Sequence, residues 1–279
     1  MSWSRDWAIL QGKNSELTYE KKHELNLGID LGFLDNRINF SMDWYKRKNY
    51  DLIGWLSTTG LDGEIGKYAN VASMRSHGIE LTLSTRNIAK KDFKWNTDFI
   101  FSKTKNKVTD LEAFSSVMDM VSGYGFAMQG YPVRSLFSLD FRGLNEEGLP
   151  TFINENGELT TSNINFQERN NKSHLIYEGT TDPTITGSLG NVFSYKGLKL
   201  NVFITYFFGN VIRLDPVFSN QYTDLDAMPK EFKNRWMRPG DEHRTNIPVI
   251  ADKYMNVNDK LSEPLPTMLI ITPVTASQR

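Results

Sequence analysis

Four histidines are the side chains of this 279-residue sequence best suited to bind a transition metal or transfer a proton. They are His23, His77, His174 and His243, and no two of them have the close spacing of a metal-binding motif. The chain contains no cysteine. This excludes a thiol nucleophile, a disulfide framework, cysteine-ligated zinc and iron–sulfur clusters. The sequence therefore predicts no metal site, and we expect the histidines in solvated or loop positions.

Two acidic segments, "DLDAMPKEF" and "NEEGLP", bring carboxylates together as acid/base catalysis or calcium binding would require. Neither has the alternating acidic positions and the turn glycine of an EF-hand loop. The glycine-rich "GYGFAMQGYP" lacks the strand, the G-x-G-x-x-G spacing and the helix of a dinucleotide site. These segments are typical of exposed loops. The sequence predicts no catalytic residue and no cofactor, and we expect a protein that is not an enzyme.

Aromatic side chains in the expected loops are the remaining candidates for ligand contact. Exposed aromatic rings can stack on sugar rings or dock a partner, but aromatic rings also pack compact loops onto themselves. Both interpretations remain open at this point. The segment "WMRPGDEHR" favours a structural turn. The candidate contact residues are Trp55, Tyr124, Tyr131, Tyr222 and Trp236.

Composition places limits on the class of protein. A hydrophobic content of 39 % excludes wholesale disorder, and a net charge of −1 gives no general attraction for nucleic acid. The sequence has no apolar stretch at its start that fits a signal peptide, and no run of about 18 apolar residues for a membrane helix. We therefore expect either a soluble protein or an internal part of a longer exported protein.

The segment "NLGIDLGFLDNRINFSMDWY" predicts a β-hairpin whose two faces differ in polarity. A two-residue turn at Asp35-Asn36 suits positive φ angles, and apolar and polar residues alternate on both sides of it. Glycines, carboxylates and small polar residues form the second face: Gly28, Asp30, Gly32, Asn39, Ser41 and Asp43. The predicted apolar pairs are Phe33 with Ile38, Leu31 with Phe40, Ile29 with Met42, and Leu27 with Trp44.

Two further hairpins follow the same pattern. One turns at Lys196-Gly197 and pairs Tyr195 with Leu198, and the other joins "GIELTLST" to "WNTDFIFS" through a short polar connection. The connections between hairpins are long, at about 28 and 78 residues against a usual loop of about 4 to 6. The predicted strands are 24–34, 37–48, 77–86, 94–105, 184–195 and 197–209, and the predicted loops are 49–76, 106–183 and 210–279.

Two all-β architectures fit this pattern. A soluble, secreted β-sandwich that binds carbohydrate would turn its apolar faces inward. An outer-membrane β-barrel has short periplasmic turns, long external loops, strands of about 10 residues and aromatic girdles. The alternation of short and long connections favours the barrel. So do the aromatic residues at the hairpin ends, which include Phe33, Trp44, Tyr45, Phe193, Tyr195, Tyr206 and Phe208.

Five segments in order along the chain resemble SusC/RagA-like TonB-linked outer-membrane proteins, also called TonB-dependent receptors. The first, "LTYEKKHELNLGIDLGFLDNRINFSMDWYKRKNYDLI", has Tyr19 where that family usually has tryptophan. The next are "NVASMRSHGIELTLS" and "GYPVRSLFSLDFRGLNEEGLPTF". The last are "TDPTITGSLGNVFSYKGLKL" and "RWMRPGDEHRTNIP". The resemblance covers most of the chain.

The resemblance implies an incomplete C-terminal portion of an antiparallel transmembrane β-barrel. About six strands would belong to a barrel of about 22 strands that encloses a plug. We expect no signal peptide, plug domain or closing strands within these 279 residues. The family implies import of glycans or peptides across the outer membrane of a Bacteroidota-type bacterium. The implied partners are a SusD/RagB-like surface lipoprotein, outer-membrane lipid, and the TonB-ExbB-ExbD complex, which would act through the plug region.

Overall fold

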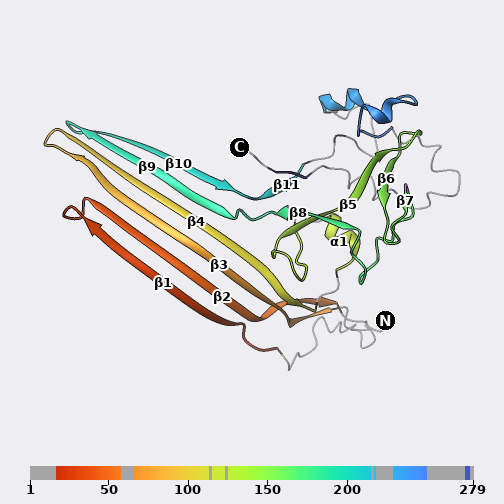
Figure 1. Cartoon of the computed structure of the whole chain (residues 1–279), viewed down its shortest axis with the longest axis horizontal. Coiled ribbons are helices and arrows are strands. Elements are labelled where there is room, and N and C mark those ends of the chain that lie inside the picture. The colour runs from red at the N-terminus through yellow and green to blue at the C-terminus, as the bar shows by residue number, and fades with distance from the viewer. Residues whose placement is uncertain are drawn as a thin grey trace, which may run out of the picture. The chain divides into compact units, whose positions relative to one another are not determined.

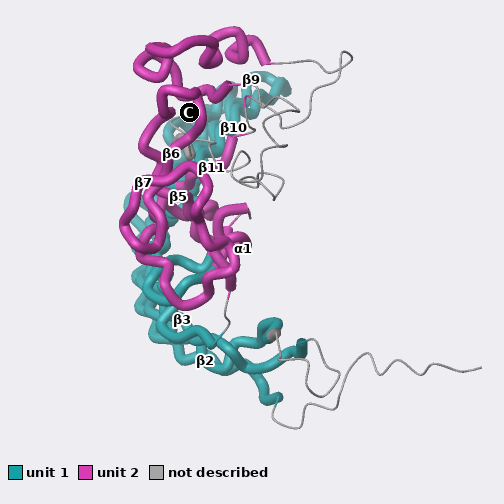
Figure 2. The backbone as a smooth tube through the Cα atoms, turned by 90° about the vertical axis from the view of Figure 1, so that its right-hand side faces the viewer, with its two compact units in different colours: residues 1–114, 127–133, 183–209 teal, residues 115–126, 134–182, 210–279 magenta. Residues whose placement is uncertain are grey.

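Long antiparallel strands dominate the fold. A computed structural model describes residues 17–57, 66–112, 115–122, 125–214, 217 and 229–249, and the backbone of 274–276. The chain divides into two compact units, which Figure 2 colours separately. Unit 1 comprises residues 1–114, 127–133 and 183–209, and unit 2 comprises the rest.

The strands of unit 1 form a single six-stranded antiparallel sheet, in which they are hydrogen-bonded in the order β1-β2-β3-β4-β9-β10 (Figure 1). Apolar and polar residues alternate along these strands, as expected for a sheet with two different faces. The strands are β1 (Lys21–Phe33), β2 (Ile38–Ser57), β3 (Gly66–Ala89), β4 (Phe93–Leu111), β9 (Ile185–Tyr195) and β10 (Leu198–Phe208).

The turns of the hairpins follow from residues that tolerate positive φ. Asp35 and Asn36 have φ angles of 54° and 60°, and Lys196 and Gly197 have 43° and 89°, as the central residues of a type I′ turn require. Every apolar pair predicted for the first hairpin is present, from Phe33 opposite Ile38 to Leu27 opposite Trp44. The predicted pairing of Tyr195 with Leu198 is also confirmed.

The strands β2, β3 and β4 are longer than the sequence predicted. Residues 49–57 continue β2, residues 66–76 begin β3, and residues 106–111 end β4, although all three were expected in loops. β3 alone has 24 residues, whereas a tilted strand crosses a bilayer with about 9 to 11. The backbone ladder therefore continues well past the segments whose apolar residues alternate.

Unit 2 folds around its own core. Within the predicted loop 106–183, the structure contains a four-stranded sheet in the order β7-β6-β5-β8 and a short helix. Val117 and Val121 of the helix pack with Leu139 and Phe152 of the sheet. These elements are α1 (Val117–Ser122), β5 (Ser135–Leu144), β6 (Pro150–Ile153), β7 (Leu159–Thr160) and β8 (Leu175–Thr180).

The helix α1 is short, and Ser116 and Asp119 cap its N-terminus. The Ser116 backbone amide donates to the Asp119 carboxylate at 2.8 Å, and the Asp119 backbone amide donates to the Ser116 hydroxyl at 3.3 Å. This reciprocal pair is a capping box.

The remaining elements of unit 2 are β11 (Val211–Arg213), β12 (Val274–Ala276) and the 3₁₀ helices η1 (Lys230–Asn234) and η2 (Asp241–His243).

Candidate functional site

One face of the six-stranded sheet is largely apolar, although Thr97 and Asn191 form a hydrogen-bonded polar pair within it. Residues paired across neighbouring strands lie on the same face of a sheet. Leu31 lies opposite Phe40, Phe40 opposite Leu83, Leu83 opposite Phe99, and Phe99 opposite Leu189. The apolar side chains of β1 on this face are between 43 % and 60 % exposed. Within the described part of unit 1, no second sheet covers this face, which is the reverse of a β-sandwich.

The apolar surface has the height of a bilayer core. On β9 it runs from Tyr195, beside the turn, to Ile185 at the other end of the strand. These residues are about 34 Å apart along an extended strand, or about 26 Å along the membrane normal at a 40° tilt. Outer-membrane barrels carry an outward apolar band about 25 Å tall. The sheet therefore presents a band of membrane-spanning height.

The opposite face of the sheet is polar. The Ser41 hydroxyl donates to the Asp30 carboxylate at 2.5 Å, and the Ser84 hydroxyl donates to the Asp98 carboxylate at 2.7 Å. Farther from the turns, Glu24 accepts a hydrogen bond from the Arg47 guanidinium at 2.7 Å. These hydrogen-bonding side chains lie in exposed positions. They suit contact with water or polar solutes, and they do not form an isolated acid/base pair.

The glycines of the polar face accommodate neighbouring side chains. A Cβ at Gly28 would lie 2.8 Å from the Asp43 carboxylate, and one at Gly78 would lie 2.5 Å from the Tyr45 hydroxyl. Tyr45 is 4 % exposed and shares a 2.7 Å hydrogen bond with the Thr104 hydroxyl. Its predicted place in an aromatic girdle is wrong because its ring lies on the polar face. Gly78 is needed for the close packing of that ring.

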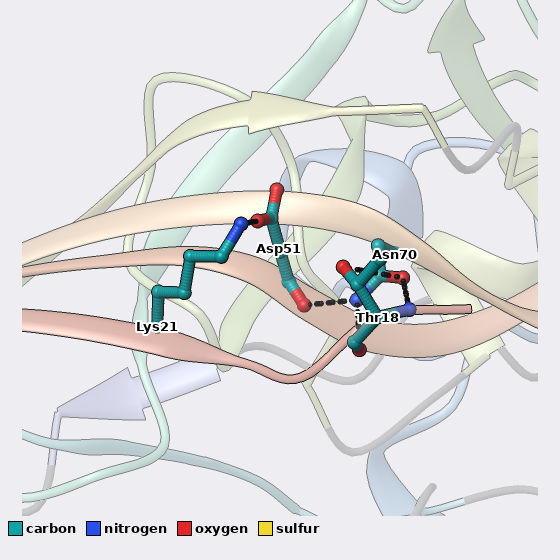
Figure 3. Close-up of polar contacts among 4 residues, drawn as sticks. All are labelled: Thr18, Lys21, Asp51 and Asn70. Atoms are coloured by element: carbon teal, nitrogen blue, oxygen red, sulfur yellow. Dashed lines mark hydrogen bonds and ion pairs between the residues drawn. The ribbon is translucent and has the colours of Figure 1, made fainter. Parts of the chain in front are cut away.

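A polar cluster lies beside the start of β1, where the regular pairing of β2 with β3 is interrupted (Figure 3). It consists of Thr18, Lys21, Asp51 and Asn70. Asp51 has a φ of 55°, in the left-handed region. The Asn70 amide donates to the Asp51 carbonyl at 2.6 Å and to the Thr18 carbonyl at 2.9 Å, while its oxygen accepts from the Thr18 amide at 2.7 Å. Lys21 pairs with the Asp51 carboxylate at 2.7 Å. Asn70 of β3 therefore joins β2 to the segment that precedes β1, a role that its sequence position did not signal.

Replacing this asparagine should loosen the bulge. In Asn70→Ala, two carbonyls and one amide lose their protein partner, which we expect to cost about 1 to 2 kcal/mol because water replaces it in part. Amide hydrogen exchange around Thr18 and Ile53 should accelerate about tenfold, while the middle of β3 stays protected. Lys21→Met is the control, because it removes only an exposed ion pair worth about 0 to 1 kcal/mol. Equal acceleration in both variants would contradict the role of Asn70.

Of the four histidines, His174 is buried, with 8 % of its surface exposed, and the other three are exposed. Neither ring nitrogen has a hydrogen-bond partner among the described residues. Burial lowers the pKa of His174 below its ordinary value, and the carboxylates of Glu155 and Glu168 oppose that shift. A neutral, enclosed imidazole fits a packing role in unit 2. The groups of His, Asp and Glu in the described residues include none arranged to hold a metal ion.

The candidate ligand-contact aromatics are in several different places. Trp55 lies within strand β2 instead of a loop, is 51 % exposed and packs edge-on against Tyr68 with ring centroids 5.3 Å apart. Tyr131 is half-buried, and its carbonyl accepts the Val108 amide at 2.8 Å. Tyr124 and Tyr222 lie outside the described residues. Of the two candidates that the structure describes in unit 1, Trp55 and Tyr131, Trp55 is the exposed one.

Trp236 belongs to unit 2 and anchors the segment that was predicted to be a turn. Its indole N–H donates to Glu242 at 2.9 Å, and this hydrogen bond lowers the pKa of the Glu242 carboxyl. The ring packs directly over Gly148, which has a φ of 76° and no Cβ to obstruct it. The Asp241 carboxylate accepts the Arg238 amide at 3.2 Å. These contacts show that Trp236 packs the loop.

Comparison with known proteins identifies the family. The profile of the family described as "TonB dependent receptor-like, beta-barrel" matches residues 5–228. The chain belongs to this family. Among the described residues, no helix combines the length and apolar character needed to cross a membrane.

The individual relatives are receptors of the same kind. Similar proteins include TonB-dependent receptor P3 of Formosa agariphila, with 27 % identity over 205 residues that cover 68 % of this chain and 20 % of that protein. TonB-dependent receptor SusC of Bacteroides thetaiotaomicron is 31 % identical over 99 residues, or 35 % of this chain and 10 % of that protein.

A solved structure shows the same fold. The structure of the RagAB peptide transporter has a TM-score of 0.70 and 22 % identity, and the match covers 90 % of this chain and 28 % of that one. The match thus spans 20 % of the length of P3 and 28 % of the RagAB chain. The TonB-dependent barrel fold predicted from the sequence is confirmed.

Proposed function

We propose that this chain is part of an outer-membrane active transporter that imports glycans or peptides and is energised through TonB. The observation that carries the proposal is the separation of faces on the six-stranded sheet. Its apolar band has the height of a bilayer core, and its polar face carries groups such as Asp30 and Ser84 that suit a water-filled lumen. Membership in the TonB-dependent receptor family supports the same placement. Transport of this kind makes or breaks no bond in the solute.

The proposed class of solute and the proposed partner protein are based on the relatives named above. SusC is a TonB-dependent receptor, and RagAB is a peptide transporter. We extend from these a polar solute of the oligosaccharide or peptide class and a SusD/RagB-like lipoprotein above the external loops. Trp55, which is exposed on the extended part of β2, is available for contact with either. Both extensions are proposals for the full-length protein.

The test is uptake by cells that express the full-length protein in a Bacteroidota host. We expect the protein in the outer-membrane fraction, together with uptake of labelled oligosaccharides or peptides that stops when tonB is deleted. The lipoprotein should co-purify with the transporter in mild detergent. Uptake that continues without TonB would contradict active transport. A protein that stays in the soluble fraction despite a functional export signal would contradict the barrel assignment.

A further inference from the structure

Lysine and arginine side chains crowd the apolar face of the sheet just beyond the apolar band. Continuing outward from Trp44 and Ile79, the same face changes abruptly from apolar to basic. We call this cluster the basic belt. It consists of Lys46, Lys48, Arg75, Lys103, Lys105 and Lys107, all of them exposed.

The strand register places these cations directly beside one another. Lys48 of β2 lies opposite Arg75 of β3, and Arg75 lies opposite Lys107 of β4. One step closer to the band, Lys46 and Lys105 flank His77. Neighbouring strands are about 4.8 Å apart, and like charges directly opposite each other destabilise a sheet. The belt therefore has an unfavourable charge density unless an anion lies against it.

Neighbouring acidic side chains do not neutralise the belt. None of its six members has an ion pair or a side-chain hydrogen bond within the described part of the chain. Of the nearby carboxylates, Asp43, Glu24 and Glu80 lie on the opposite face of the sheet, since they alternate with the belt positions along the strands. Asp110 lies opposite Ser73, beyond the register shift next to Lys107, and forms no ion pair with the belt among the described residues. Asp51, beyond the belt, is already paired with Lys21. The positive charge is thus confined to one face.

The position of the belt indicates what covers it. If the sheet spans the membrane as proposed above, short turns face the periplasm and the belt lies at the outer boundary of the bilayer. Basic clusters at this level attract anionic lipid headgroups, and phosphate accepts several charge-assisted hydrogen bonds from lysine and arginine. We propose that the basic belt binds the phosphate groups of the outer-leaflet glycolipid, lipid A. This inference rests on the proposed function for its membrane placement.

The test measures binding of lipid A to the full-length protein in phosphatidylcholine nanodiscs. Bisphosphorylated and dephosphorylated lipid A are titrated, and bound lipid is counted by native mass spectrometry. At about fivefold per lysine, Lys46→Gln/Lys105→Gln/Lys107→Gln should weaken binding of the bisphosphorylated form about 100-fold. The control Lys90→Gln/Lys91→Gln/Lys94→Gln removes the same charge at the turn end of the sheet, and should leave binding within about threefold.

Two results would overturn the proposal. One is equal affinity for the phosphorylated and dephosphorylated lipids, and the other is an equal loss of binding in the belt and control variants. A gel-shift assay for heat-sensitive barrel structure is run on every sample. Failure of the wild-type protein to insert in any nanodisc would contradict the barrel function, whereas insertion without phosphate selectivity would contradict only the lipid-binding inference.

Discussion

Leu83→Arg is expected to destabilise the folded barrel in a lipid bilayer strongly. Leu83 lies near the middle of the apolar band, between Phe40 on β2 and Phe99 on β4. An arginine on the lipid face at mid-bilayer costs about 2 to 4 kcal/mol. This corresponds to about a 30- to 1,000-fold lower ratio of folded to unfolded protein. Urea titration of the full-length protein in lipid vesicles, followed by the heat-dependent gel shift, measures the loss.

Thr82→Arg is the matched control for this prediction. Thr82 is the preceding residue of β3, is exposed, and lies opposite Ser41 on the polar face. The same side chain added there enters an aqueous lumen, so we expect a change in stability below about 1 kcal/mol. Similar losses in both variants would mean that the two faces share one environment. A severe loss in Thr82→Arg alone would place the polar face in a core and reverse the assignment of inside and outside.

The register of the hairpins was predictable from the sequence, whereas the length of the strands was not. A slip of one residue would exchange the faces, so the alternation around Asp35-Asn36 and Lys196-Gly197 fixes each pairing. Beyond the band, both faces become polar, as at Lys46, Arg47 and Lys48. Alternation of apolar and polar residues shows where the two faces of a strand meet different surroundings. It does not show where the backbone hydrogen bonds end, so the strands continue beyond the alternating segments.

Unit 2 was missed because the connection between β4 and β9 was interpreted only as a long loop. Its sequence does contain strand and turn signals: "SLFSLDFRGL" leads into the turn at Asn145 and then into "PTFI". Phe152 and Leu139 are both buried there, at 0 % and 3 % exposure. These short strands have buried apolar residues of their own, so they belong to a small separate core. The long two-faced strands do not show this pattern.

The ligand-contact candidates were the hardest residues to place because aromatic side chains serve several roles. Trp236 satisfies its indole N–H with Glu242 and covers Gly148, whereas Trp55 remains 51 % exposed at the end of a strand. The sequence around Trp236 does not show this outcome, since Gly148 lies far earlier in the chain. The basic belt was overlooked for a related reason. Its members are spread over three strands and gather only through the register.

Gly187→Ala is expected to destabilise the β4–β9–β10 part of the sheet by about 1 to 3 kcal/mol, as overpacking in a tight site does. Gly187 lies opposite Phe101 on β4 and Tyr206 on β10. A Cβ there would collide with the Ile100 carbonyl oxygen and with the Tyr206 ring and hydroxyl. The backbone oxygen cannot move aside without disturbing the ladder. The Tyr206 hydroxyl, which donates to that oxygen at 3.0 Å, would lose its place.

Gly190→Ala on the same strand separates this effect from a general intolerance of side chains in β9. A Cβ at Gly190 would lie 3.2 Å from Cδ2 of Phe203, an exposed ring that can shift, and 3.8 Å from the Asp98 carbonyl. We expect its cost to stay below about 1 kcal/mol in urea titration of the full-length protein. In Gly187→Ala/Tyr206→Leu the ring clash is relieved but the contact with the Ile100 carbonyl persists, so stability should recover only in part. Full recovery would assign the strain to the tyrosine alone, and equal costs at both glycines would contradict the close approach of β4 to β9 at Gly187.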